Sequence, residues 1–109
     1  ITYVVQENKG VAGAMNTALR HATGDFFAWL SHDDVHLPHK TARQVEYHQR
    51  LGKPDASLFS DYYLINDQGE VLHECKFSRK DFLDSPSVAL LRGKINGCTL
   101  FIPIHVLRE

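Results

Sequence analysis

The sequence predicts an α/β fold, in which a mixed sheet is flanked by helices. Over the first half of the chain, short apolar segments alternate with segments of helical periodicity, and the second half contains a hairpin signal followed by a further strand. We therefore expect a mostly parallel sheet with an antiparallel portion at the hairpin. The 109 residues, 43% of them hydrophobic, are enough for a single domain that spans residues 1–109.

The chain opens with a predicted strand and a predicted helix. Residues 1–6 are rich in β-branched and aromatic side chains, and they end at the turn signal of residues 8–10. Apolar residues then recur three and four positions apart from Val11 to Ala22, which is the spacing of one buried helical face. We expect Gly24 to provide the left-handed end of this helix.

A second strand and a second helix follow. Residues 26–30 form a continuous apolar run that is too short for a helix, which predicts a strand buried on both faces with its aromatic side chains in the core. Pro38 fits the first turn of a helix that runs to about Leu51, where Gly52 breaks it. The apolar stripe of this helix is weaker than that of the first.

The second half of the chain is predicted to add strands. Residues 66–69 carry a hairpin signal between two strands, the second of which forms a sheet edge. We expect Phe101 to pack in the core. The expected elements are strands at residues 57–65, 71–77 and 97–102, a short helix at residues 86–91, and the start of a helix at Pro103.

The balance of charges excludes two classes of partner. The formal net charge is −1, from 12 basic and 13 acidic residues spread along the chain, so there is no basic footprint for nucleic acid or for an anionic membrane. No apolar run approaches the roughly 20 residues that a transmembrane segment needs, and we expect a cytoplasmic location.

Cys75 and Cys98 are far apart and form no CxxC motif, which predicts reduced, partly buried thiols.

Two adjacent carboxylates, Asp33 and Asp34, follow the predicted buried strand. Like charges at close range repel, so such a pair is costly unless a cation neutralises it. Oxygen ligands of this kind suit Mn²⁺ or Mg²⁺, which take one or two carboxylates together with substrate phosphate oxygens. A metal held there would stabilise a diphosphate leaving group as a Lewis acid. The alternative is that both residues form a solvated turn or helix cap before Pro38.

The residues around these carboxylates resemble glycosyltransferase family 2, which is inverting and has the GT-A fold (nucleotide-diphospho-sugar transferase, Rossmann-like). The family pattern is Asn-x-Gly, a small-residue helix with a second Asn, Ala-x-Gly-Asp/Glu, an apolar strand, an acidic motif and a proline. Residues 8–19, residues 22–34 and Pro38 match it in order. The resemblance implies the central part of a catalytic domain, incomplete at both ends of the fold.

The resemblance also implies roles for individual residues. Asp33 corresponds to the last aspartate of the family's DxD-like motif and is expected to bind the metal, with Asp34 assisting. Ser31 departs from the pattern, since it stands at the first acidic position of the motif. The implied nucleotide-sugar-binding residues are Asn8, Gly10, Asn16, Ser31, His32 and Asp33. Asn16 would equally serve to satisfy nearby backbone groups.

An acceptor region is implied further along the chain. Residues 60–71 resemble the family's strand and hairpin after the metal motif, and residues 96–102 resemble the strand that precedes the acceptor site. Asp61 would contact the acceptor or close a strand end. Gly97 would permit close approach of substrate to the backbone, or would serve a turn into the strand.

Family membership would imply transfer of a sugar, commonly UDP-linked, to a saccharide or glycoconjugate acceptor in polysaccharide biosynthesis of the cell envelope. In-line attack with inversion needs a general base, which in the family's order would fall after Glu109. The family's acidic residue for the nucleotide base would fall before Ile1. We therefore expect residues 1–109 to be inactive alone, and the full protein to work at the cytoplasmic face of a membrane.

Two other functions are compatible with the residues. A local cluster of histidines and carboxylates would suit zinc and a metal-dependent hydrolase; its members are His32, Asp33, Asp34, His36 and His39. A non-catalytic interaction domain of GT-A type is the second alternative, because fold does not settle function. An unpaired sheet edge would in addition allow association into a homo-oligomer.

Overall fold

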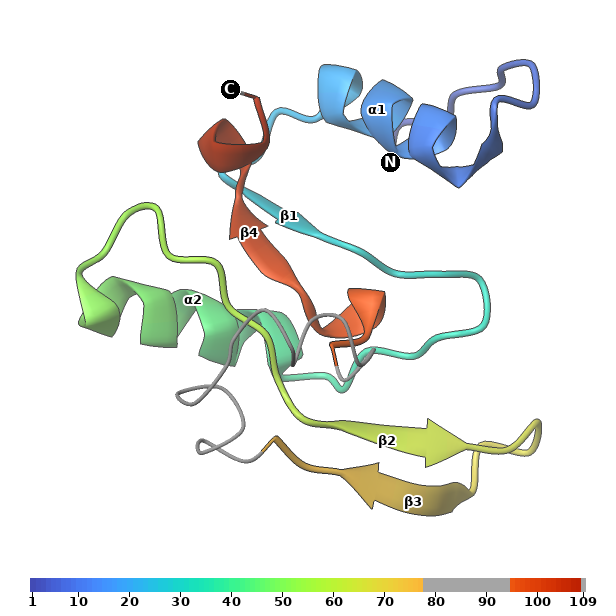
Figure 1. The fold of residues 1–109 in the computed structure, drawn as a ribbon, viewed down its shortest axis with the longest axis vertical. Coiled ribbons are helices and arrows are strands. Elements are labelled where there is room, and N and C mark those ends of the chain that lie inside the picture. Colours follow the sequence, from blue (N-terminus) through green and yellow to red (C-terminus); the bar gives the residue numbers. More distant parts are fainter. Residues whose placement is uncertain (78–94, 109) are drawn as a thin grey trace.

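A computed structural model describes residues 1–77 and 95–108, and the architecture concerns these residues. The described residues form two helices, four short strands and two 3₁₀ turns, arranged as in Figure 1. Their order is α1 (Gly10–His21), β1 (Phe26–Ala28), α2 (Lys40–Leu51), β2 (Tyr62–Ile65), β3 (Val71–Cys75), η1 (Gly97–Thr99), β4 (Phe101–Pro103) and η2 (Ile104–Leu107). Neither helix of this described part has the length and apolar character needed to cross a membrane.

The core forms around β1 and β4, which lie far apart in the sequence and pair antiparallel (Figure 1). Ala28 lies opposite Phe101, and Leu58 extends the pairing through backbone hydrogen bonds of 2.8 and 2.9 Å to Phe101. The Phe101 side chain is 2% exposed and stacks on Phe26 with ring centroids 4.4 Å apart. The predicted core position of Phe101 is confirmed, whereas residues 26, 27 and 29 are only half-buried.

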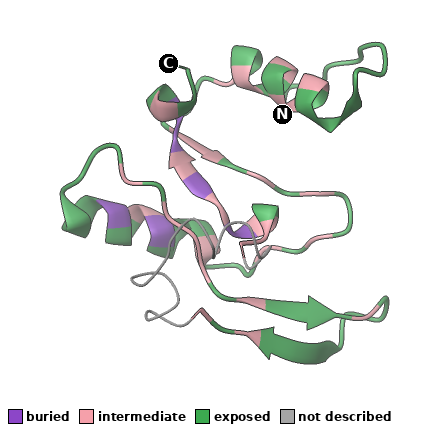
Figure 2. Ribbon diagram, in the orientation of Figure 1, coloured by how far each residue is buried: buried purple, intermediate pink, exposed green. Residues whose placement is uncertain are grey.

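Helix α2 packs a polar stripe against this core. Its buried residues are Gln44 and His48, one helical turn apart, as the weak apolar stripe in the sequence indicates. The His48 ring meets the Phe26 ring edge-on, with centroids 4.9 Å apart. Figure 2 shows the buried positions gathered on α2, on β4 and near η1. Gly52, with φ 63°, ends the helix in the left-handed conformation, as predicted.

The predicted hairpin is confirmed as a separate two-stranded antiparallel sheet, β2–β3. Asn66 orders its turn, because its side-chain carbonyl accepts the backbone N–H groups of Gln68 (3.1 Å) and Glu70 (2.8 Å). Gly69 adopts φ 81°, which an L side chain rarely tolerates. Both strands are shorter than predicted, and most of their residues are exposed.

The expectation of a mostly parallel sheet is wrong for the described residues, since both strand pairs are antiparallel. Residues 1–6, predicted as a strand, form none and are exposed. A strand is stabilised by the neighbour it pairs with, and no described segment pairs with residues 1–6. The apolar side of α1 likewise stays outside the core: none of its residues is buried.

Several predicted boundaries also shift. Helix α1 ends at His21 and its cap is the extended Ala22 rather than Gly24. The strand predicted at residues 97–102 begins only at Phe101, because Asn96 caps the 3₁₀ turn η1 and accepts the Cys98 backbone N–H. The apolar run at residues 26–30 yields only a three-residue strand. The helix expected after Pro103 is a 3₁₀ turn, η2, and the helix predicted at residues 86–91 lies outside the described residues.

Candidate functional site

The predicted metal site and part of the acceptor region lie at one end of the β1–β4 pair. In an antiparallel pair, the end of one strand lies beside the start of the other. Ala28, the last residue of β1, is opposite Phe101, the first residue of β4. The loop that leaves β1 with Asp33 and the turn that enters β4 with Gly97 therefore start from the same end of the sheet (Figure 1).

Asp33 is presented to solvent at the tip of a tight turn. The turn is closed by a backbone hydrogen bond from Asp34 to Ser31, 3.3 Å long. A hydrogen bond from the Ser31 hydroxyl, one from the backbone N–H of Asp33 itself and the nearby His32 lower the pKa of the Asp33 carboxyl. His32 Nδ1 lies 3.9 Å from Asp33 Oδ1, and the Asp33 side chain is 71% exposed. Asp33 is thus an ionised carboxylate open to a ligand.

Asp34 is less exposed than Asp33. It is half-buried, and its charge affects the Cys98 thiol. Burial raises the pKa of the Cys98 thiol, the Asp34 charge raises it further, and nearby Lys40 partly offsets these effects. Burial lowers the pKa of Lys40, whose Nζ is enclosed without a hydrogen-bond partner. The two neighbouring aspartates therefore have different environments, one exposed and one half-buried.

The donors present fit Mn²⁺ or Mg²⁺ better than zinc. Asp33 and Asp34 offer only carboxylate oxygens, and the exposure of Asp33 leaves room for waters or phosphate oxygens to complete a coordination sphere. Within residues 1–77 and 95–108, no three His, Cys, Asp or Glu side chains gather into a metal-binding group. The local zinc cluster is therefore not assembled. His36 Nε2 instead pairs with the Trp29 carbonyl at 3.1 Å, and His39 occupies the N-cap position of α2.

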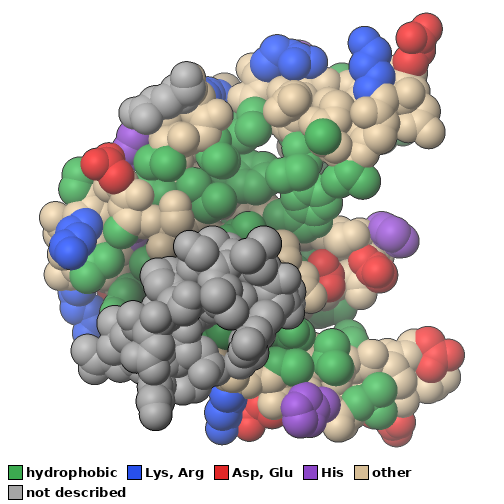
Figure 3. Space-filling model, viewed as in Figure 1, with side chains coloured by type: hydrophobic (Ala, Val, Ile, Leu, Met, Phe, Trp, Pro, Cys, Tyr) green, Lys and Arg blue, Asp and Glu red, His purple; other side chains and the backbone are tan. Residues whose placement is uncertain are grey.

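The nucleotide-binding residues predicted at α1 lie apart from this turn. The Asn8 side chain accepts the Gly10 backbone N–H at 2.9 Å, and Gly10 starts the helix with φ 69°. Asn16 is exposed on the same helix. Figure 1 shows the start of α1 and the loop after β1 as segments that do not run side by side. Figure 3 shows the molecule hollowed between them, with acidic and histidine side chains gathered over that loop.

The two predicted acceptor residues differ in their local roles. Asp61 Oδ1 accepts the Phe77 backbone N–H at 2.8 Å, so it closes the base of the hairpin. Gly97 lies exposed in η1, its φ is outside the left-handed region, and nothing lies within 4 Å of the place where a Cβ would stand. The turn itself therefore does not require glycine at position 97.

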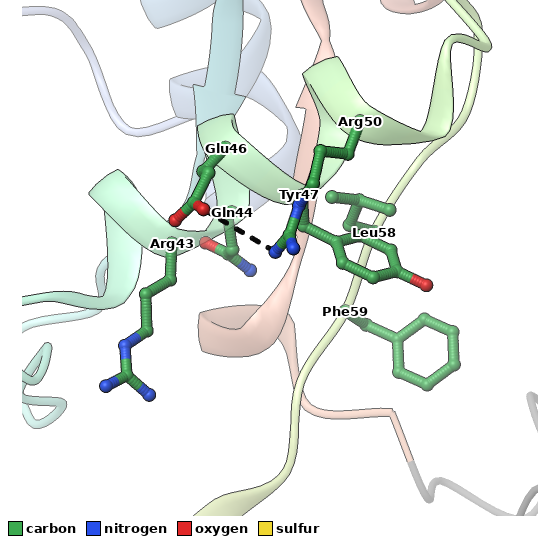
Figure 4. Close-up of a pocket in the computed structure, with 7 residues that line it drawn as sticks. All are labelled: Arg43, Gln44, Glu46, Tyr47, Arg50, Leu58 and Phe59. Atoms are coloured by element: carbon green, nitrogen blue, oxygen red, sulfur yellow. Dashed lines mark ion pairs between the residues drawn. The ribbon is translucent and has the colours of Figure 1, made fainter.

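A hollow of about 600 Å³ opens elsewhere, between α2 and the segment before β2 (Figure 4). An ion pair of 3.6 Å joins Arg50 to Glu46 along its helical side. Its lining residues are Arg43, Gln44, Glu46, Tyr47, Arg50, Leu58 and Phe59. None of these is a predicted site residue.

Sequence reasoning gave no role to two residues near the predicted metal motif, Cys98 and Lys40. Cys98 was predicted only as a partly buried, reduced thiol, and the structure shows it half-buried and free. Its interaction with the Asp34 charge crosses more than sixty positions of sequence, and no local motif signals such an interaction. Lys40 gave no signal beyond its place at the start of a predicted helix.

The chain is similar in sequence to several known proteins. Residues 1–101 match the family model described as glycosyl transferase family 2. The whole chain aligns with an uncharacterized glycosyltransferase of Rickettsia conorii at 34% identity over 112 positions, and covers 18% of that protein. It aligns with one of Rickettsia typhi at 35% identity, again over the whole chain, and covers 35% of that protein.

The chain is also similar to WfgD of Escherichia coli, a UDP-Glc:alpha-D-GlcNAc-diphosphoundecaprenol beta-1,3-glucosyltransferase. The two are 36% identical over 63 residues, which cover 58% of this chain and 24% of WfgD. No solved structure matches significantly. The chain spans 16 to 19% of the length of the first three Rickettsia relatives. Residues 1–109 thus correspond to one portion of much longer proteins.

Proposed function

Because the chain belongs to glycosyl transferase family 2, a family of the GT-A fold, we propose that the full-length protein transfers a sugar from a nucleoside-diphosphate sugar to a saccharide or glycoconjugate acceptor. The match over residues 1–101 carries this proposal. A UDP-linked donor and a lipid-linked acceptor are supported by the name of the similar WfgD. Residues 1–109 would then be the central part of its catalytic domain.

We assign the metal to Asp33 and Asp34. The fit of carboxylate oxygens to Mn²⁺ or Mg²⁺ supports this, as does the ionised, exposed state of Asp33. The bound metal would supply Lewis-acid stabilisation of the leaving diphosphate. The hydrogen bond from the Ser31 hydroxyl lowers the pKa of the Asp33 carboxyl further, so serine at the first position of the motif favours the ionised form of Asp33.

We assign the nucleotide sugar to the hollow between α1 and the loop after β1. Asn8, Gly10 and Asn16 are exposed at or just before α1, and Ser31, His32 and Asp33 belong to the loop after β1. The donor would lie between these two sets of residues and contact both. Gly97, open on the same end of the sheet as Asp33, would let the acceptor approach the backbone. Asp61 would act on the acceptor only indirectly, by shaping the hairpin.

Inverting transfer needs a base to deprotonate the acceptor hydroxyl. We propose that this base comes from outside residues 1–109, since the chain covers only part of its relatives. Residues 1–109 alone would then bind no acceptor productively and show no transfer activity.

Calorimetry on the full-length protein tests the assignment. We expect a nucleoside diphosphate, UDP in the first instance, to bind in the presence of Mn²⁺ and to bind far more weakly without it. Asp33→Asn should abolish the metal-dependent part. Asp67→Asn is a matched control, because Asp67 is an exposed turn carboxylate on the hairpin. Absence of nucleotide binding by a folded full-length protein would favour the non-catalytic interaction domain.

A further inference from the structure

The connection from α1 to β1 is held at both of its ends by η2 and the C-cap residue of this turn, Arg108 (Figure 1). Where the connection leaves α1, the Arg108 guanidinium donates to the carbonyl oxygens of Leu19 (2.9 Å) and Ala22 (2.6 Å). Where it enters β1, the backbone N–H of Ile104 donates to the Asp25 carbonyl at 2.9 Å. Contacts with one short turn therefore set the direction in which α1 leaves the β1–β4 pair.

The turn η2 is itself fixed to the core. It follows β4 directly, and its first residue, Ile104, is 8% exposed. His105 Nε2 lies 2.9 Å from Asp55 Oδ1, so the turn is also joined to the loop after α2. The backbone N–H of Arg108 donates to the His105 carbonyl at 3.1 Å. The Arg108 side chain therefore extends from a backbone that its neighbours hold in place.

Helix α1 has few other ties to the rest of the fold. None of its residues is buried. Thr17 donates a hydrogen bond to the side chain of Gln6, which belongs to the exposed N-terminal segment. Within residues 1–77 and 95–108, the hydrogen bonds that join α1 to the β1–β4 side of the structure are those from Arg108. Removal of the Arg108 guanidinium should therefore leave the helix free to change its angle to β1.

The angle of α1 bears on the proposed donor site. Helix α1 joins the start of β1, whereas the loop with Asp33 follows the end of the same strand. A ligand that contacts both binds only the fraction of molecules in which α1 has the right orientation, and its apparent dissociation constant rises as that fraction falls. A residue that restricts the orientation of α1 therefore strengthens binding without touching the ligand.

We propose that Arg108 is a positioning residue for the nucleotide sugar, which holds α1 at the angle to β1 that lets the donor contact both α1 and the loop after β1. This inference rests on the proposed function, because it requires α1 to contribute to the donor site. Arginine suits the role because its planar guanidinium presents several donors in a fixed geometry and reaches two carbonyl groups at once. Its positive charge is also favoured at the C-terminal end of a helix.

Variants of the full-length protein test the role through UDP affinity in the presence of Mn²⁺, measured by calorimetry, and through kcat and the KM for the donor. Arg108→Met keeps an apolar stem and removes every donor. We expect it to weaken UDP binding about 5-fold, which corresponds to about 1 kcal/mol, and to raise the donor KM with kcat nearly unchanged. Arg108→Lys should recover most of the affinity, because an ammonium group also donates to carbonyl oxygens.

Arg50→Met is the matched control. Arg50 is an exposed arginine of α2 that pairs with Glu46 at 3.6 Å, and its loss should leave UDP binding unchanged. Hydrogen exchange of the α1 amides and the melting temperature are measured for each variant. We expect faster exchange in α1 for Arg108→Met, with the melting temperature nearly unchanged.

The outcomes separate the two proposals. If the unsubstituted protein is folded and binds no UDP, the proposed function fails and the role of Arg108 fails with it. If it binds UDP, unchanged affinity in Arg108→Met would overturn the role of Arg108 alone. Weaker binding without faster exchange in α1 would also overturn it, because the effect would not pass through the helix. Equal losses in Arg108→Met and Arg108→Lys, together with lower melting temperatures, would show that Arg108 only supports the fold.

Discussion

The guanidinium of Arg108 donates hydrogen bonds to the carbonyl oxygens of Leu19 (2.9 Å) and Ala22 (2.6 Å), and so closes the C-terminal end of α1 from a residue near the other end of the chain. The last carbonyls of a helix have no partner within the helix. A cation at this end also interacts favourably with the helix dipole. Arg108 therefore supplies the helix end that the sequence attributes to Gly24.

Loss of this contact should loosen α1. We expect Arg108→Ala to destabilise the helix end by about 1 kcal/mol, because two charge-assisted but solvent-exposed hydrogen bonds are lost. Hydrogen exchange of the amides in Gly10–His21 measures the effect. Arg50→Ala is the control, since Arg50 pairs with Glu46 at 3.6 Å on its own helix surface. Equal exchange in α1 for both variants would show that Arg108 does not support it.

The stack of Phe26 on Phe101 predicts where the core is most sensitive. Phe101→Ala should lower the free energy of unfolding by about 3–5 kcal/mol, because it empties the most enclosed aromatic position and removes a stacked partner. Urea unfolding measures the change. Tyr63→Ala, at a hairpin position that is 46% exposed, should cost less than about 1 kcal/mol. Comparable losses in both variants would contradict a core centred on Phe101.

Ser31→Ala should raise the pKa of Asp33 toward its ordinary value of 3.8, because the hydrogen bond from the Ser31 hydroxyl is the largest cause of the lowered pKa. A lowered folded-state pKa favours folding above the ordinary value, and this contribution is lost as the pH falls through the folded pKa. The Ser31→Ala protein should lack part of that dependence in the acid range. NMR titration of protein labelled at aspartate measures the pKa of Asp33. If this pKa were the same in Ser31→Ala as in the unsubstituted protein, the hydrogen bond from Ser31 would be refuted.

Two glycines of similar exposure should respond differently to alanine. Gly69→Ala should cost about 1–2 kcal/mol, because its φ of 81° places an alanine Cβ in the strained left-handed region. Gly97→Ala should leave the stability nearly unchanged, because its backbone is unstrained and the space for a Cβ is open. If an acceptor approaches Gly97 as proposed, the same variant should raise KM for the acceptor. Thermal unfolding measures the change in stability, and kinetics of the full-length protein with varied acceptor measure KM. An unchanged KM for the acceptor in Gly97→Ala would show that the acceptor does not approach Gly97.

Local signals in the sequence were sufficient for the elements they encode directly. The glycine that ends α2 was predicted correctly, since a left-handed conformation at Gly52 depends on the residue itself. The hairpin was predicted for the same reason, because Asn66 and Gly69 supply the turn from within four residues. The ordered set of motifs at residues 8–19, residues 22–34 and Pro38 also carried enough pattern to indicate the family that the comparisons show.

Strand pairing could not be predicted in this way. The mostly parallel sheet was expected from the alternation of strands and helices, yet β1 pairs antiparallel with β4, a segment more than seventy positions away. The strand predicted at residues 1–6 needs a neighbour that the described residues do not provide. Pairing depends on which segments meet in space, and hydrophobic periodicity does not specify this.

The sequence by itself determined the α/β class, the second helix, the hairpin and the family motif, because each depends on residues close together in the chain. Only the tertiary structure decided that Arg108 ends α1 and that Gln44 reaches the Thr99 carbonyl. These contacts form when the start of β4 lies beside the end of β1. Their physical origin is the burial of Phe101 between separate segments, and no local pattern of residues can encode that arrangement.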